Sequence, residues 1–340
     1  MVLKRLSEAA GVSGQEQEVR AIIRAELEGA VHSLEGDTLG NLIAVRNPHA
    51  PGPRVMLAAH MDEVGFMISG YERSGMLKFR KVGGIDDRVL VSKGVRIGKD
   101  RIPGVIGAKP IHLQEARERE TPLRTDQLFI DIGAKSKEEA EKKVALGEFA
   151  VFDTAYAEFG AGLVKGKALD DRIGCAVLIS LLKEEINLPV YGCFTVQEEV
   201  GLRGAAVAAY RVNPQLGIAI EGTICADLPG IDEEFRVTSL GQGPALSIAD
   251  GGTLPNRAMV NELVRLAQAH QVPFQFRRGT AGANDAGRIH LTREGVPTAG
   301  VSVPCRYIHG PASVASLDDF RHTVRLLTLF LKSIEGGFRP

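Results

Sequence analysis

The amino-acid sequence, 340 residues long, predicts an α/β protein in which a small β-barrel interrupts a larger layered domain. Continuous apolar runs, which are typical of buried parallel strands, alternate with helical segments in residues 1–70 and again in residues 164–340. Between these stretches, residues 71–163 carry short and often alternating strand patterns separated by glycine turns. We therefore expect one discontinuous domain, built from residues 1–70 and 164–340, into which residues 71–163 are inserted as a second domain.

The larger domain is predicted to alternate strands with helices. Strands are expected over residues 42–45, 55–59, 190–196, 216–220 and 296–303, and helices over residues 17–28, 171–182, 201–210, 256–270 and 317–334. The segment 171–182 is apolar on nearly every face, which predicts a buried helix. The last helix has Ser316 as its N-cap, with Asp318 and Asp319 in its first turn. This alternation predicts a largely parallel sheet, and functional side chains collect at the carboxyl ends of the strands in such sheets.

The inserted segment, residues 71–163, has a different sequence pattern. Short strands are expected over residues 76–82, 89–97, 102–106, 128–132 and 149–152. Residues 136–144 are charged and indicate a short surface helix, and the highly charged residues 114–125 indicate an exposed loop. Short strands with frequent turns predict a small β-barrel.

The composition excludes several classes of protein. The net charge is -1, Trp is absent and aromatic residues make up 5% of the chain, so we expect neither a basic nucleic-acid-binding surface nor a base-stacking surface. No apolar run approaches about 18 residues, so no transmembrane helix is expected. The four cysteines are widely spaced, without a Cys-x-x-Cys pair, which predicts free thiols and a reducing cytoplasm.

Acidic residues and histidines follow several of the predicted strands. The apolar run 55–59 leads directly into His60 and Asp62, which share a face if the strand pattern continues. The other members of this set are Glu198 and Glu199 after residues 190–196, Glu221 after residues 216–220, His309 after residues 296–303, and Asp170 ahead of the buried helix. Two imidazoles and several carboxylates, one of which can bridge, are the ligands that a two-metal site requires.

Each of these motifs also has a structural explanation when it is taken alone. Adjacent acids such as Glu198 and Glu199 are common in the first turn of a helix, and Asp170 is a typical helix cap. The sequence also contains a near copy of the Asp170 motif, in which Asp86 precedes an alternating strand of the insert. Because Asp170 instead precedes a buried helix of the α/β domain, we assign the ligand to Asp170.

The order and context of these motifs resemble the M42 family of dinuclear metallo-aminopeptidases. The resemblance extends over nearly the whole chain and includes residues 13–14, 251–256, 279–286 and 306–309. It implies a three-layer α/β/α catalytic domain of the phosphorylase/hydrolase-like type, with an inserted PDZ-like β-barrel for dimerisation. It further implies a homo-oligomer, commonly a tetrahedral dodecamer, that acts on short peptides.

The resemblance implies a ligand set for two divalent metal ions, Zn²⁺ or Co²⁺, with Mn²⁺ as a further candidate. By position, Asp170 would bridge the two ions. The terminal ligands would be His60 and Glu221 for one ion and Glu199 and His309 for the other.

Two further residues receive catalytic roles from the resemblance. Glu198 would be the general base, which takes a proton from water and delivers it to the leaving amine. Asp62 would orient His60 through a hydrogen bond. Glu63, which follows in the same motif, receives no role.

The sequence departs from the family pattern at three positions. Many members have Asp where this chain has Glu221, so the nearby Asp227 is an alternative ligand. Gly310 stands where Ser is common, and Asn284 stands where Thr is frequent. None of these changes removes a type of ligand, so we expect an active enzyme.

The predicted function is removal of N-terminal residues from short peptides by water activated at two metals. The alternatives are a carboxypeptidase or deacylase of the same clan, or a glycoside hydrolase that uses paired carboxylates. A glycosidase cleft is usually rich in aromatic residues, and the absence of Trp argues against it. Basic residues would favour substrates with an acidic N-terminal residue only if they line the pocket for its side chain. The candidates are Arg257, Arg277, Arg278 and Arg306.

Overall fold

The larger domain is built on one sheet of 11 strands. The computed structural model describes residues 1–340, except for the side chain of Glu118. The strand order is β1-β2-β12-β3-β13-β16-β17-β11-β10, with β14 and β15 attached to β16. The bounds are β1 (Ser33–Gly36), β2 (Leu42–Arg46), β3 (Val55–His60), β10 (Ala157–Phe159), β11 (Leu163–Gly166), β12 (Val190–Thr195), β13 (Leu216–Ile224), β14 (Ala245–Ser247), β15 (Gln275–Arg277), β16 (Thr298–Arg306) and β17 (Ser313–Ser316). The central strands β12, β3, β13 and β16 run parallel, so their carboxyl ends meet at one edge.

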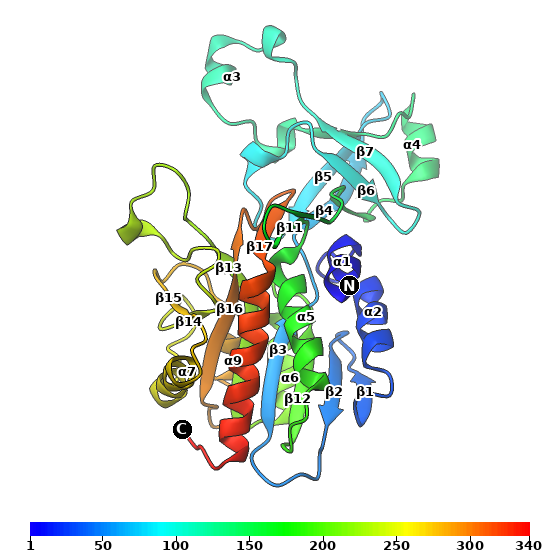
Figure 1. Cartoon of the computed structure of the whole chain (residues 1–340). Coiled ribbons are helices and arrows are strands. Elements are labelled where there is room, and N and C mark those ends of the chain that lie inside the picture. Colours follow the sequence, from blue (N-terminus) through cyan, green and yellow to red (C-terminus); the bar gives the residue numbers. More distant parts are fainter.

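Helices cover both faces of this sheet (Figure 1). Their bounds are α1 (Val2–Glu8), α2 (Gln17–Leu27), α5 (Leu169–Lys183), α6 (Arg203–Val212), α7 (Arg257–Ala269), α8 (Ala286–Ile289) and α9 (Leu317–Glu335). Strand β3 is buried along its whole length, and its side chains alternate between two cores. Leu57 and Ala59 pack into the core beneath α5 and α9, whereas Met56 and Ala58 pack into the core beneath α6. The predicted α/β/α layering is therefore confirmed.

The long elements predicted from the sequence are present in the described chain. The closing helix α9 begins at Leu317, and the Ser316 hydroxyl accepts hydrogen bonds from the backbone N–H groups of Asp318 and Asp319. Helix α5 is buried on nearly every face, as its composition predicts. The sequence did not predict α1 or the short strands at the sheet edges, because they carry too few residues for a periodic pattern. None of the described helices has the length and apolar character to cross a bilayer.

The remaining strands close into an antiparallel barrel in the order β4-β5-β8-β7-β6-β9. Its elements are β4 (Gly65–Tyr71), β5 (Leu77–Val82), β6 (Gly94–Ile97), β7 (Ile102–Gly107), β8 (Phe129–Asp131), β9 (Phe149–Phe152), α3 (Ala116–Glu120) and α4 (Lys137–Lys143). The barrel has its own core, in which the ring of Phe66 packs edge-on against Phe79 at 5.2 Å and Phe152 at 5.1 Å. Figure 1 shows it beyond the carboxyl ends of the central strands, with α3 projecting farthest.

Strand pairing places the limits of the barrel at Gly65 and Phe152, rather than at the predicted 71 and 163. Strand β4 pairs with β5 and β9 over its length, so residues 65–70 belong to the barrel. Strand β10 pairs with β11, which lies in the large sheet. The expected strand 89–97 is also shorter, because Asp87–Val89 form a 3₁₀ turn and only Gly94–Ile97 pair. The charged loop 114–125 contains α3.

Glu63, which had no role in the sequence analysis, lies in a buried ion cluster. Its carboxylate is 2.6 Å from Lys167 Nζ and 2.9 Å from an Arg172 guanidinium nitrogen, and all three side chains are almost fully buried. Arg172 also donates to the backbone carbonyls of Leu6 and Ala9. The cluster therefore ties the N-terminal segment to the turn after β3 and to the start of α5.

Replacing Glu63 with Gln is expected to destabilise the protein strongly. The substitution removes the negative charge that faces two buried cations, and breaking a buried ion pair in this way costs about 3–5 kcal/mol. The measurement is the urea concentration at the midpoint of unfolding. The matched control is Glu294→Gln at an exposed position, which should leave the midpoint unchanged. A Glu63→Gln midpoint equal to that of the control would contradict this role.

Candidate metal centre

The predicted site residues come together at the carboxyl edge of the sheet. His60 is the last residue of β3, and Glu221 lies within β13. Glu198 and Glu199 follow β12, in a turn where Gln197 adopts a positive φ of 57°. Asp170 stands in the first turn of α5, and His309 lies in the loop after β16. Five separate segments thus supply one cluster, which only the parallel arrangement of the strands could assemble.

Asp170 stands between the two imidazoles. Its Oδ1 atom lies 3.4 Å from His60 Nε2, and its Oδ2 atom lies 3.3 Å from His309 Nε2. His60 Nε2 is also 3.5 Å from a Glu221 oxygen, while His309 Nε2 is 3.3 Å from Glu199 Oε1. The site therefore has two halves that share one carboxylate, which is the arrangement of a bridging ligand.

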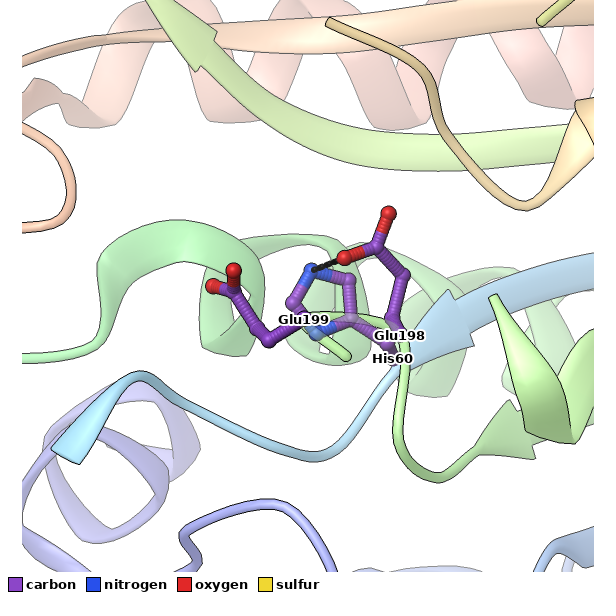
Figure 2. A group of neighbouring side chains, drawn as sticks. All are labelled: His60, Glu198 and Glu199. Carbon is purple, nitrogen blue, oxygen red and sulfur yellow. Dashed lines mark ion pairs between the residues drawn. The ribbon is translucent and has the colours of Figure 1, made fainter. Parts of the chain in front are cut away.

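Glu198 lies beside one half of this cluster. Its Oε2 atom is 4.0 Å from His60 Nε2 (dashed line in Figure 2), whereas the Glu199 side chain extends to the other side of the ring. The two adjacent glutamates therefore point to different parts of the site. This separation allows one glutamate to bind a cation while the other accepts and donates a proton.

Asp62 makes more contacts than the sequence suggested. The predicted contact with His60 consists of its backbone oxygen, 3.1 Å from His60 Nδ1, and its Oδ1 atom, at 3.4 Å. Its buried carboxylate also accepts hydrogen bonds from the backbone N–H groups of Glu198 and Glu199, at 3.0 and 3.2 Å, and from the Ser13 hydroxyl at 2.6 Å. Asp62 therefore positions the turn that carries both glutamates as well as the imidazole.

Burial and close charges perturb the pKa values of the cluster. Burial, opposed by the nearby His60, raises the pKa of Glu198 to about 9. Burial disfavours the His309 cation, but hydrogen bonds to Asp170 and Glu199 outweigh it and raise the pKa of His309 to about 11. The carboxylates therefore hold protons on the imidazoles. Divalent cations in place of those protons would leave the imidazoles neutral and the carboxylates ionised, as metal ligation requires.

The residues present fit divalent cations by their donor chemistry. Potential ligand atoms lie within 4.8 Å of one another in three groups, which are His60 with Glu198 and Glu199, His60 with Asp171 and Glu221, and Asp170 with Glu199 and His309. Glu199 Oε1 is buried, and His309 Nε2 lies 3.3 Å from it. Several buried carboxylates gathered in one place are costly unless cations offset their charge.

Three aspartates that are alternative candidates for ligands are occupied by other partners. Asp171 accepts hydrogen bonds from the backbone N–H groups of His60 and Gly174, at 3.1 and 3.0 Å. Asp86, in the near copy of the Asp170 motif, is paired with the exposed Arg88. Asp227, the alternative to Glu221, forms a two-pronged pair with Arg306 at 2.7 Å for each contact. The geometry therefore favours Asp170 and Glu221 as the ligands.

Sequence reasoning missed two buried acids that support the site. Asp285 accepts a 2.5 Å hydrogen bond from the Thr195 hydroxyl, and its own N–H lies 3.4 Å from Glu221. Glu16 accepts hydrogen bonds from the backbone N–H groups of Gly14 and Gln197, and burial raises its pKa to about 7. Apart from Gly14, these partners are far from the two acids in the sequence, so no local pattern could reveal the contacts.

A cavity of about 170 Å³ opens directly onto the cluster. Its lining includes the clustered residues His60, Asp170, Glu198, Glu199, Glu221 and His309. The cavity is also lined by Asp250, Arg277 and residues 281–284. A substrate bound here would touch both the proposed metal ligands and the polar side chains of Asp250, Arg277 and Asn284.

Comparison with known proteins agrees with this geometry. The model of the M42 glutamyl aminopeptidase family matches residues 40–326. The putative aminopeptidase FrvX of Escherichia coli is 38% identical, covering 98% of this chain and 95% of the relative. The lysyl aminopeptidase of Pyrococcus furiosus and the glutamyl aminopeptidase of Lactococcus lactis are each 32% identical, over 98% of this chain and 97% and 95% of theirs.

Solved structures show the same fold over nearly the full length. A TET aminopeptidase from a marine sediment Thaumarchaeota archaeon has a TM-score of 0.94 at 35% identity, covering 98% of this chain and 97% of its own. The TET1 peptidase of Pyrococcus horikoshii, described as able to form a tetrahedron or a large octahedral shell, has a TM-score of 0.86 at 34% identity, covering 96% and 97%. A Thermotoga maritima protein described as an endoglucanase has a TM-score of 0.81 at 36% identity, covering 98% and 99%.

The family match spans most of the chain, and it includes each of the strand ends from which the donor cluster is built. With relatives above 30% identity along almost its whole length, this chain belongs to the M42 family of metal-dependent aminopeptidases.

Proposed function

We propose that the cavity at the sheet edge binds two divalent cations, Zn²⁺ or Co²⁺, and hydrolyses the N-terminal peptide bond of short peptides. The observation that carries this proposal is the position of Asp170, whose two oxygens each face a different imidazole. His60 and Glu221 would complete one cation site. Glu199 and His309 would complete the other.

In this proposal Glu198 is the general base. When bound, the cations supply Lewis acidity, which lowers the pKa of water and polarises a carbonyl group. Glu198 lies beside the cation site, with Oε2 4.0 Å from His60 Nε2, and once ionised its carboxylate can accept a proton from water. Asp62 keeps the base in place by holding the Glu198 backbone N–H. Glu198 then passes the proton to the leaving amine.

The experiment that tests this function is chelation. EDTA should abolish release of amino acids from aminoacyl anilides, and Zn²⁺, Co²⁺ or Mn²⁺ added back should restore it. A glycoside hydrolase with paired carboxylates needs no metal, so its activity would survive EDTA. This comparison is needed because one solved relative is described as an endoglucanase. Metal-independent cleavage of a glucan, without cleavage of anilides, would overturn the proposal.

The chemical state of the two ends of the substrate distinguishes an aminopeptidase from a carboxypeptidase or a deacylase. An aminopeptidase requires a free α-amine, so acetylation of the N-terminus should stop cleavage. A carboxypeptidase would instead require a free C-terminal carboxylate, and a deacylase would prefer the acetylated substrate. Cleavage of a free-amine anilide, which lacks a C-terminal carboxylate, therefore distinguishes all three.

We further propose that residues 65–152 form the dimerisation domain of a homo-oligomer, such as a tetrahedral dodecamer. The Pyrococcus horikoshii relative is described as assembling into such a shell. In this chain, Ile111 and Leu113 are 69% and 60% exposed and shortly precede α3 in the sequence. Helix α3 lies in the projecting part of the barrel domain (Figure 1). Apolar side chains exposed in this way are suited to burial against a second copy.

A further inference from the structure

Arg277 is a nearly buried cation in the wall of the substrate cavity. Its side chain is 9% exposed, and it lines the same cavity as the metal donors. Its guanidinium donates to the Thr223 hydroxyl at 3.1 Å and to the backbone carbonyls of Gly279, at 3.0 Å, and Ala281. All three acceptors are neutral. Among the side chains that the structure describes, none with a negative charge lies within ion-pair distance of Arg277.

Strand β13 places Arg277 relative to the proposed metal ligands. Thr223, whose hydroxyl accepts a hydrogen bond from Arg277, stands two residues after the proposed ligand Glu221 on this strand. Residues two apart on a strand share a face and lie about 6–7 Å from each other. The guanidinium is therefore beside the cation site, at a distance that the side chain of a bound N-terminal residue can reach.

A guanidinium in this position has capacity for an anion. It carries five N–H donors and cannot lose its charge at physiological pH. Three donors are used by the neutral acceptors, so two remain. A buried charge without a counter-charge is costly, and a carboxylate that enters the cavity would remove that cost while forming charge-assisted hydrogen bonds.

Asp250, a charge of opposite sign that lines this cavity, already uses three of the roughly four acceptor sites of its carboxylate. Its Oδ1 atom accepts hydrogen bonds from the backbone N–H groups of Gly252 and Thr253, at 2.8 and 2.7 Å. Its Oδ2 atom lies 3.3 Å from the amide nitrogen of Asn284. Asp250 therefore closes the loop 250–253, and it has less capacity for a cationic substrate than Arg277 has for an anionic one.

We propose that Arg277 determines specificity by binding the side-chain carboxylate of an N-terminal Glu or Asp. The proposal rests on the aminopeptidase function proposed above. Family membership does not decide it, because the relatives include both a lysyl and a glutamyl aminopeptidase.

The experiment compares glutamyl and glutaminyl p-nitroanilides, which have nearly the same shape and differ in charge. The intact enzyme should have a kcat/KM about 10- to 100-fold higher for the glutamyl substrate, as expected for a charge-assisted hydrogen bond. Arg277→Gln should bring the two values within about threefold by lowering only the glutamyl value. Arg278→Gln, a neighbouring and exposed arginine outside the cavity, is the matched control and should keep the preference.

Further measurements distinguish a change in specificity from a folding defect of the variant. They also distinguish binding of the substrate's side-chain carboxylate from binding of its C-terminal carboxylate. Activity of Arg277→Gln on alanyl p-nitroanilide should stay within about threefold of the intact enzyme, because that substrate makes no contact with the charge. Competitive inhibition of the intact enzyme by free glutamate should be stronger than by free glutamine, and this test needs no variant. The activities of Arg277→Gln on Ala-Ala and on its C-terminal amide should likewise stay within about threefold of the intact enzyme, and they should change equally.

The proposal is overturned if the intact enzyme cleaves glutaminyl or lysyl anilides as well as glutamyl anilide. It is also overturned if Arg277→Gln loses Ala-Ala but not its amide, since Arg277 would then bind the C-terminal carboxylate. Failure of the proposed function has a different signature, because no aminoacyl anilide would then be cleaved at all.

Discussion

Replacing Glu198 with Gln should lower kcat by about 10²- to 10⁴-fold, the range that general-base catalysis typically contributes. Gln has nearly the same size but cannot accept the proton from water. The backbone N–H of residue 198 would still donate to Asp62, so the turn should keep its position. The proposed cation ligands are untouched, and metal content should therefore equal that of the intact enzyme.

Two measurements belong together in this test, steady-state kinetics and metal content by mass spectrometry. Glu185→Gln, at an exposed position outside the site, is the control for the loss of a glutamate charge. Near-normal turnover by a fully loaded Glu198→Gln enzyme would show that another group is the base. Loss of metal in this variant would instead make Glu198 a ligand.

Replacing Asp170 with Ala should remove most of both cations and lower activity by more than about 10³-fold. Each oxygen of this carboxylate faces one imidazole, at 3.4 and 3.3 Å, so its loss opens both halves of the site. The two-metal mechanism needs both ions to activate water and to stabilise the transition state. Metal content per subunit is the direct measurement.

The chain itself provides a matched control for this substitution. Asp86 is also the first acid of an Asp-Asp-Arg motif, but its carboxylate is paired with Arg88 at the surface. Asp86→Ala should therefore keep both cations and normal activity. Full metal occupancy in Asp170→Ala, or metal loss in Asp86→Ala, would show that the ligand was assigned to the wrong motif.

The layered fold could be predicted because its strongest signals are local. Residues 55–59 of strand β3 and residues 173–182 of helix α5 are almost entirely apolar, and such runs favour burial on both sides. The limits of the barrel could not be predicted as well. Residues 65–70 are also apolar, so composition alone cannot show that β4 pairs with β5 and β9 rather than with the sheet.

The proposed site could be located for the same topological reason. Parallel strands bring their carboxyl ends to one edge, so His60, Glu198 and Glu221 had to be near one another once the sheet was predicted. The supporting contacts could not be predicted, because they depend on three-dimensional packing. Asp62 reaches the Glu198 backbone across 136 residues of sequence, and Glu63 reaches Lys167 across 104.

Anomalous X-ray scattering from crystals soaked in Zn²⁺ would show directly whether two cations share Asp170. We expect two peaks per subunit, about 3.5–4 Å apart, the usual separation in two-metal sites. One peak should lie against His60 and Glu221, and the other against Glu199 and His309. A single peak, or peaks that do not touch the Asp170 carboxylate, would contradict the account.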